Sequence, residues 1–136
     1  MAIGVHDMVR DLQGRVTTAS VDDVKAGIDA GTLEYLIDVR DAGEYRQGHI
    51  PSARNVSRGM LELKLDPDAP MPDPELAGKW DSSIVVYCLR GPGFRSLAAA
   101  DTLARMGYTN VKQLAGGMDA WAGAGLGLDS AAQSGT

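Results

Sequence analysis

Hydrophobic residues follow two different spacings, and these two spacings alternate along the chain. Short apolar or β-branched runs predict five strands, at 15–19, 35–39, 53–56, 83–88 and 111–114. Segments with apolar residues three or four apart predict helices between them, at 4–12, 20–31, 41–45, 60–65, 94–106 and after 116–117. Strands that alternate with helices predict an α/β fold with a central, mostly parallel sheet and helices on both faces.

Turn-forming and capping residues mark the ends of these elements. Ser20 is a predicted N-cap, Asp41 and Glu44 have capping-box spacing, and Gly31 and Gly107 are predicted helix ends. Four prolines between 66 and 74 exclude a helix or a central strand and predict an extended surface loop. The domain prediction is an N-terminal helical extension at 1–15, one domain at 16–126 and a flexible tail at 127–136.

Composition narrows the classes of partner. The chain has 136 residues and a net charge of -5, which argues against nucleic acid and against anionic membranes. No apolar stretch reaches membrane-spanning length, and the N-terminus does not read as a secretory signal. The single cysteine excludes an internal disulfide, and it argues against a thiolate-rich metal site, so no metal is predicted. These features predict a cytoplasmic location.

The strand at 83–88 ends in Cys88 and is followed by a glycine-rich loop and a long helix. Ligands collect at the carboxyl ends of strands in parallel sheets, so the cysteine is placed where a site is expected. Backbone N–H groups of such a loop can converge on one point, and the helix start adds the positive end of its dipole. Both favour a thiolate over a thiol. The predicted anion-binding loop contains Leu89, Arg90, Gly91, Pro92, Gly93, Phe94 and Arg95.

The alternative to this hypothesis is that Cys88 is a structural residue without a chemical role. Free cysteines are often small buried residues without any chemistry. Cys88 at a strand end would not by itself favour a nucleophile, but the glycines, Arg95 and the helix start beside it do.

Three residues outside the loop are candidates for supporting the site. Asp38 and Arg40 lie at the end of another predicted strand and can reach the same edge of the sheet as Cys88, where an ion pair that holds two loops together is the favoured interpretation. Arg58 can attract anions to the mouth of the site or lie on the surface. His49 is interpreted as a hydrogen-bonded turn residue rather than as a base.

Taken in order, the motifs of this chain resemble the rhodanese family. Each motif is weak by itself, whereas the whole series, which spans Val16 to Leu126, is specific. The motifs are Leu36-Ile37-Asp38-Val39-Arg40, Glu44-Tyr45, Gly48-His49-Ile50-Pro51 with Ala53 and Asn55, Val85-Val86-Tyr87-Cys88, Arg95-Ser96, Gly107-Tyr108, Asn110-Val111, and Leu114-Ala115-Gly116-Gly117 with Trp121.

The resemblance implies a rhodanese fold with a five-stranded parallel sheet, and a reaction that needs no cofactor. It implies that Cys88 takes sulfane sulfur from a small anionic donor such as thiosulfate, carries it as a persulfide, and passes it to cyanide or a thiol. A protein can also be the sulfur acceptor. The loop N–H groups would form the cradle, and Arg95 would close the loop and brace nearby carboxylates.

One departure from the family pattern keeps other functions open. Sulfurtransferases of this family usually have four residues between the cysteine and the arginine, and the related phosphatases and arsenate reductases have five, whereas this chain has six, 89–94. A longer loop leaves room for a tetrahedral oxyanion, and Pro92 removes one N–H from the cradle. Phosphatase or arsenate reductase chemistry therefore remains an alternative, as does a binding module without catalysis.

Overall fold

The computed structural model describes residues 2–130 and is built on a single sheet of five parallel strands. Across the sheet the order is β1-β5-β4-β2-β3, so that β4, which leads into the cysteine, is central. The predicted strands and their parallel arrangement are confirmed. The strands are β1 (Thr18–Ala19), β2 (Tyr35–Asp38), β3 (Arg54–Asn55), β4 (Ile84–Tyr87) and β5 (Val111–Leu114).

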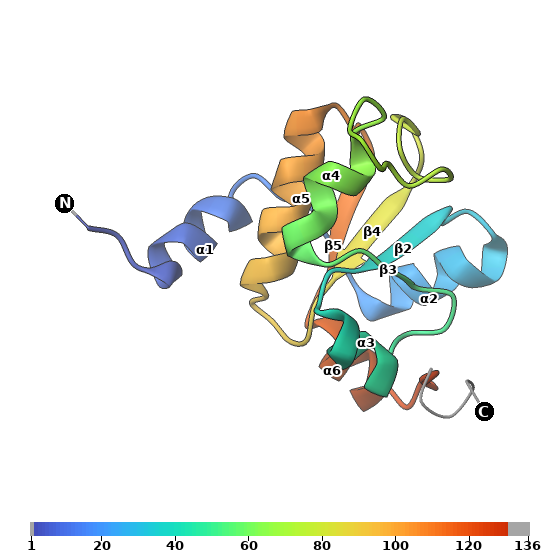
Figure 1. Ribbon diagram of the computed structural model, residues 1–136. Coiled ribbons are helices and arrows are strands. Elements are labelled where there is room, and N and C mark those ends of the chain that lie inside the picture. Colours follow the sequence, from blue (N-terminus) through green and yellow to red (C-terminus); the bar gives the residue numbers. More distant parts are fainter. Residues whose placement is uncertain (1, 131–136) are drawn as a thin grey trace.

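Helices cover both faces of the sheet, as predicted (Figure 1). Helices α4 and α5 pack on one face, and α2, α3 and α6 pack on the other. A short 3₁₀ turn, η1 (Arg58–Met60), leads into α4. The helices are α1 (Val5–Gln13), α2 (Val21–Ala30), α3 (Ala42–Gln47), α4 (Leu61–Leu65), α5 (Phe94–Met106) and α6 (Gly117–Gly123).

Strand β4 is apolar at every position because both of its sides are buried. Ile84 and Val86 belong to the core under α4 and α5, whereas Val85 and Tyr87 belong to the core that includes Trp121 of α6. The same alternation puts the side chain that follows Tyr87 on the α5 side of the sheet.

The predicted helix ends are confirmed by their local geometry. The Ser20 hydroxyl accepts a hydrogen bond from the Asp23 amide at 3.1 Å, and the Asp41 amide donates to Glu44 Oε1 at 3.2 Å. Gly107 ends α5 with φ of 118°, in the left-handed region that glycine adopts without strain. These caps explain why the sequence positions of the helices agree so closely with the structure.

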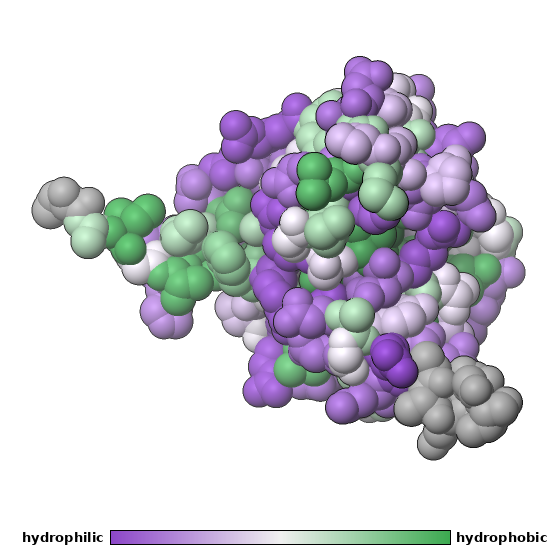
Figure 2. Space-filling view, in the orientation of Figure 1, coloured by the Kyte–Doolittle hydropathy of each residue, from purple (hydrophilic) through white to green (hydrophobic). Residues whose placement is uncertain are grey.

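The N-terminal helix α1 projects from the domain and contacts it along one side of α5 (Figure 1). Its inner residues Val9 and Leu12 pack against Leu97. Its outer apolar residues stay exposed, with Met8 41% and Ile3, just before the helix, 70% exposed. Figure 2 shows these hydrophobic side chains along the projecting segment.

The segment predicted as a flexible tail starts with residues that are bound to the domain. The amide of His49 donates to Asp129 O and the amide of Asp129 donates to His49 O, both at 2.9 Å. The indole of Trp121 donates to Gly127 O at 3.0 Å. Hydrogen bonds therefore anchor residues 127–129 to the domain, and residues 131–136 of that predicted tail lie outside the described residues.

Within residues 2–130, none of the helices combines the length and the apolar character that crossing a membrane requires.

Candidate active site

Cys88 is the first residue after β4, at the carboxyl end of the central strand. Its side chain lies on the α5 side with Val86, and the residue is only 3% exposed. The loop that follows lies at the end of the sheet where α3 and α6 begin (Figure 1). The structure thus places the cysteine at the sheet edge where ligands bind in parallel α/β folds.

Two oxygen atoms surround the sulfur. Cys88 Sγ lies 3.3 Å from Ser96 Oγ and 4.0 Å from the carbonyl oxygen of Arg90. Within residues 2–130 these are its hydrogen-bond partners, and both can accept a bond from S–H. The cradle of backbone amides expected between Leu89 and Arg95 stays a prediction, because these contacts do not include an amide.

Gly93 covers the sulfur with its backbone. A Cβ at this position would lie 2.3 Å from Cys88 Sγ and 2.9 Å from Arg90 O. No side chain fits there, so only glycine allows the chain to approach the sulfur this closely. Gly93 is also the N-cap residue of α5, and its carbonyl accepts the first helical hydrogen bond, from Leu97.

The start of helix α6 holds the other end of the loop. The Met118 amide donates to Cys88 O at 3.0 Å, and the Asp119 amide donates to Leu89 O at 2.9 Å. A Cβ on Gly117 would lie 2.6 Å from Cys88 O, so the Gly-Gly pair is needed for this close approach. Amides at the N-terminus of α6 therefore bind the backbone of the cysteine loop.

Arg95 braces the loop against helix α3, which agrees with the role predicted for it. Its guanidinium lies 2.7 Å from Glu44 Oε1 and 3.4 Å from Glu44 Oε2. This hydrogen bond lowers the pKa of Glu44 and raises the pKa of Arg95, and Cys88 as an anion raises the pKa of Arg95 further. Arg90 in contrast points to the surface, 3.4 Å from Asp119.

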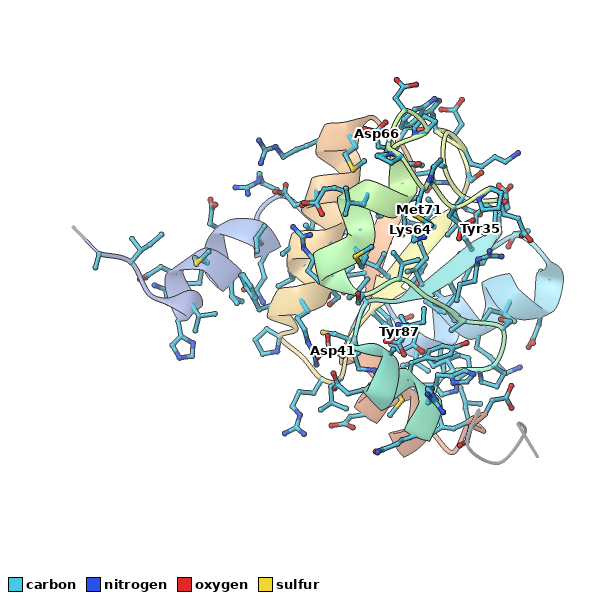
Figure 3. All side chains as sticks on the ribbon, in the orientation of Figure 1. Tyr35, Asp41, Lys64, Asp66, Met71 and Tyr87 are labelled. Atoms are coloured by element: carbon cyan, nitrogen blue, oxygen red, sulfur yellow. The ribbon has the colours of Figure 1, made fainter. Side chains whose placement is uncertain are left out.

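Asp38 and Arg40 form the predicted ion pair, and both are almost completely buried. Arg40 Nη2 lies 2.7 Å from Asp38 Oδ2 and donates to Gly48 O at 2.6 Å. Figure 3 shows Tyr87 at the same end of the sheet as Asp41, where α3 begins. Burial raises the pKa of Tyr87 far above its usual value, and the charge of Asp38 adds to that effect. The pair joins the end of β2 to the turn before β3.

His49 and Arg58 are both engaged away from the sulfur. His49 Nδ1 lies 2.8 Å from Tyr45 O, and its ring stacks on Tyr45, so the interpretation as a turn histidine is confirmed. The guanidinium of Arg58 contacts Glu62 at 2.9 Å and Thr102 at 3.0 Å, between α4 and α5. A role of Arg58 in attracting anions stays a prediction.

Sequence reasoning missed two polar residues behind the sulfur. Ser96, in the first turn of α5, and Gln113, on β5, are both buried and hydrogen-bonded to each other at 2.8 Å. The available sequence signal was a glutamine inside the predicted strand 111–114, because a polar residue in a core strand needs hydrogen-bond partners. Its register partner Val86 shows that it shares the sheet face with Cys88.

Comparisons with known proteins agree with this arrangement. The model of the rhodanese-like domain family matches residues 20–124. A chloroplastic thiosulfate sulfurtransferase of Arabidopsis thaliana is 38% identical over 93 residues, which cover 66% of this chain and 75% of that protein. The chain spans between 60 and 75% of the length of the first curated relatives that it matches.

Two solved structures extend the comparison. A Rhodopseudomonas palustris protein of unknown function, called a possible tyrosine phosphatase, is 32% identical with a TM-score of 0.84, covering 95% of this chain and 96% of its own. The human single-domain sulfurtransferase is 27% identical with a TM-score of 0.66, covering 79% and 96%. Fold, cysteine position and family match point the same way, and the chain belongs to the rhodanese-like domain family, whose curated relatives here include sulfurtransferases.

Proposed function

We propose that this protein transfers sulfane sulfur through a persulfide on Cys88. The observation that carries the proposal is the position of this residue, at the carboxyl end of the central strand, where the loop 89–93 leads into the start of α5. The first amides of α5 have no partner within the helix and lie next to the sulfur-covering Gly93. They are available to a negative charge built on Sγ.

The proposed reaction has two displacements. The Cys88 thiolate attacks the outer sulfur of thiosulfate, a new S–S bond forms, and the S–S bond of the donor breaks as sulfite leaves with the electron pair. Cyanide or a thiolate then attacks the outer sulfur of the persulfide. The S–S bond to Cys88 breaks, and its electron pair returns to Sγ as thiolate.

The surroundings of the sulfur favour a single transferred atom over a tetrahedral oxyanion. Gly93 lies so close over Sγ that a Cβ there would be 2.3 Å from the sulfur, and one added sulfur atom needs less of this space than a phosphate group. Arg95 already directs both terminal nitrogens to the Glu44 carboxylate, so a phosphate would have to compete with this ion pair for them. Both observations support sulfur transfer.

Intact-protein mass spectrometry tests the proposal directly. After exposure to thiosulfate, the wild-type protein should gain the mass of one sulfur atom, and cyanide should remove it with release of thiocyanate. Cys88→Ser should show neither change. A wild-type protein that never acquires the sulfur adduct from thiosulfate or from polysulfide would contradict the proposal.

Phosphatase chemistry is the second candidate, because the loop is long and one similar structure carries that description. Hydrolysis of p-nitrophenyl phosphate that is inhibited by orthovanadate and lost in Cys88→Ser would favour it. The same sample of protein should be used in both assays, so that an inactive preparation cannot decide between them.

A further inference from the structure

A series of hydrogen bonds runs from the sulfur along the α5 face of the sheet to the edge strand β1. Ser96 Oγ lies 3.3 Å from Cys88 Sγ and 2.8 Å from Gln113 Oε1. Gln113 Nε2 donates to Thr18 Oγ1 at 3.1 Å. Thr18 and Gln113 are register partners on β1 and β5, so their side chains share the face of the sheet on which α5 lies.

In this arrangement the hydroxyl proton of Ser96 points away from the sulfur. Ser96 has one proton, and the acceptors available for it are Gln113 Oε1 at 2.8 Å and Gly93 O at 3.2 Å. Its oxygen can then accept from the S–H of Cys88. The polarity of the chain therefore fits a neutral thiol.

The opposite polarity is equally satisfied if the amide of Gln113 turns over. The NH₂ group would then donate to Ser96 Oγ, and the carbonyl oxygen would accept from the hydroxyl of Thr18, which can serve as donor or acceptor. The Ser96 proton would be free to donate to a charged sulfur, and a bond to a charged acceptor is the stronger kind. Each member of the chain keeps a partner in both arrangements.

We propose that Gln113 is a positioning residue whose amide turns over when Cys88 loses its proton, so that Ser96 donates to the sulfur anion. This inference rests on the proposed function in so far as the anion is the reacting species. Its effect is on the sulfur through Ser96, because Gln113 itself contacts Ser96 and Thr18.

Other charges near Cys88 act on it independently of this chain. Arg95 from α5 faces it and is paired with Glu44 from α3. Arg90 of the loop is paired with Asp119 from α6, and both of these are exposed. The buried Asp38–Arg40 pair belongs to the neighbouring strand β2. None of them changes when Gln113 or Ser96 is replaced, so the variants below isolate the polar chain.

The first test is the pH profile of Cys88 alkylation by iodoacetamide in the full chain. Gln113→Met keeps the length of the side chain and removes its hydrogen bonds. The thiol state loses little, because Ser96 can turn to Gly93 O, whereas the anion loses the donation that orients Ser96. We expect the midpoint of the profile to rise by about half a unit to one unit, a three- to tenfold lower anion fraction at neutral pH.

Two further variants test the direction of the shift in the alkylation midpoint and whether that shift is transmitted through Ser96. Gln113→Glu should raise the midpoint more, because a carboxylate can only accept from Ser96 and adds a like charge. Ser96→Ala should raise it as well, and adding Gln113→Met to Ser96→Ala should raise it no further. An unchanged midpoint in Gln113→Met, or an equal shift with and without Ser96, would overturn the proposal.

A matched control lies one residue away from the chain. Thr17→Val is a control at the exposed residue before Thr18. The Thr17 side chain is not part of the hydrogen-bond series formed by Ser96, Gln113 and Thr18, so the midpoint should stay at the wild-type value. A shift in Thr17→Val as large as that in Gln113→Met would show that the effect is not specific and would overturn the proposal.

The second test uses the wild-type protein, so it does not depend on the folding of any variant. The NH₂ protons of Gln113 should show nuclear Overhauser contacts to Thr18 at low pH and to Ser96 above the alkylation midpoint, with no change in Cys88→Ser. Contacts to Thr18 at every pH would overturn the proposal. Neither test uses a sulfur donor, so a failure of sulfur transfer would leave these results intact and would count against the proposed function alone.

Discussion

Two strand ends at the same edge of the sheet carry charged or reactive side chains, and they are built in opposite ways. At the end of β2, the buried Asp38 and Arg40 bind each other, and Arg40 also binds the backbone carbonyl of Gly48. After β4, Cys88 is covered by glycine backbone, with one hydroxyl and one carbonyl oxygen beside it. The two strand ends have equivalent positions in the fold, yet at the end of β2 the polar groups are all used in bonds that hold loops together.

This difference shows what separates a structural strand end from a reactive one. A buried ion pair whose groups are all bonded within the protein has no capacity left for a substrate. Cys88 Sγ lies 3.3 Å from the Ser96 hydroxyl, which can donate or accept a hydrogen bond and so can still respond to a charge on the sulfur. The comparison predicts that changes after β2 affect stability and that changes after β4 affect chemistry.

The largest expected effect is on stability after β2. Arg40→Met leaves the buried Asp38 carboxylate without its cation and should lower the free energy of unfolding by about 3–5 kcal/mol. Urea denaturation measures it, and the alkylation rate of Cys88 in the folded protein should stay unchanged. Arg46→Met, at an exposed position of α3, is the control and should cost less than about 1 kcal/mol. A similarly small loss for Arg40→Met would contradict the structural role.

The next effect is on chemistry after β4. Gly93→Ala would place a methyl group 2.3 Å from Sγ, so the loop must shift and the sulfur must lose its geometry. Sulfur transfer should fall by about a hundredfold. Gly43→Ala in α3, where a Cβ meets nothing within 4 Å, should keep full activity. Normal transfer rates in Gly93→Ala would mean that the backbone over the sulfur is not part of the site.

A stabilising change is expected in the segment between α3 and β3. Ser52 has φ of 72°, a left-handed conformation that glycine adopts more easily. Ser52→Gly should therefore raise the free energy of unfolding by about 0.5–1 kcal/mol, with unchanged sulfur transfer. Ser57→Gly is the comparison. Ser57 has an ordinary φ of -60°, so glycine brings no relief there and only increases the freedom of the unfolded chain, and this variant should be less stable than the wild type. Equal effects of the two changes would remove the conformational explanation.

The smallest effect concerns the ion pair that links the two regions. Glu44 has a lowered pKa because of Arg95, so its contribution to stability is present above the ordinary value of 4.5 and is lost as the pH falls through the lower folded value. Both side chains are 36% exposed, so Glu44→Gln should cost less than about 1 kcal/mol at neutral pH. Urea titrations between pH 3 and 7 should show the difference vanish in acid, and a constant difference would exclude the ion pair as its cause.

Local signals in the sequence determined most of the fold. The apolar runs gave the five strands, and caps such as Ser20 and Gly107 placed the helix ends within about a residue, because these interactions act between near neighbours in the chain. The same reasoning placed Cys88 at a strand end before a helix. The pairing of Asp129 with His49 was not predictable, because that contact joins distant segments.

What only the tertiary structure decided is the surroundings of the sulfur. Ser96 of α5 reaches Cys88, and Gln113 of β5 reaches Ser96, and both contacts depend on strand register and on the face to which each side chain points. The resemblance implied that Arg95 braces carboxylates, but only the packing of α3 identified Glu44 as its partner. The physical reason is the same in each case: hydrogen bonds between distant segments are chosen by packing, which no local pattern encodes.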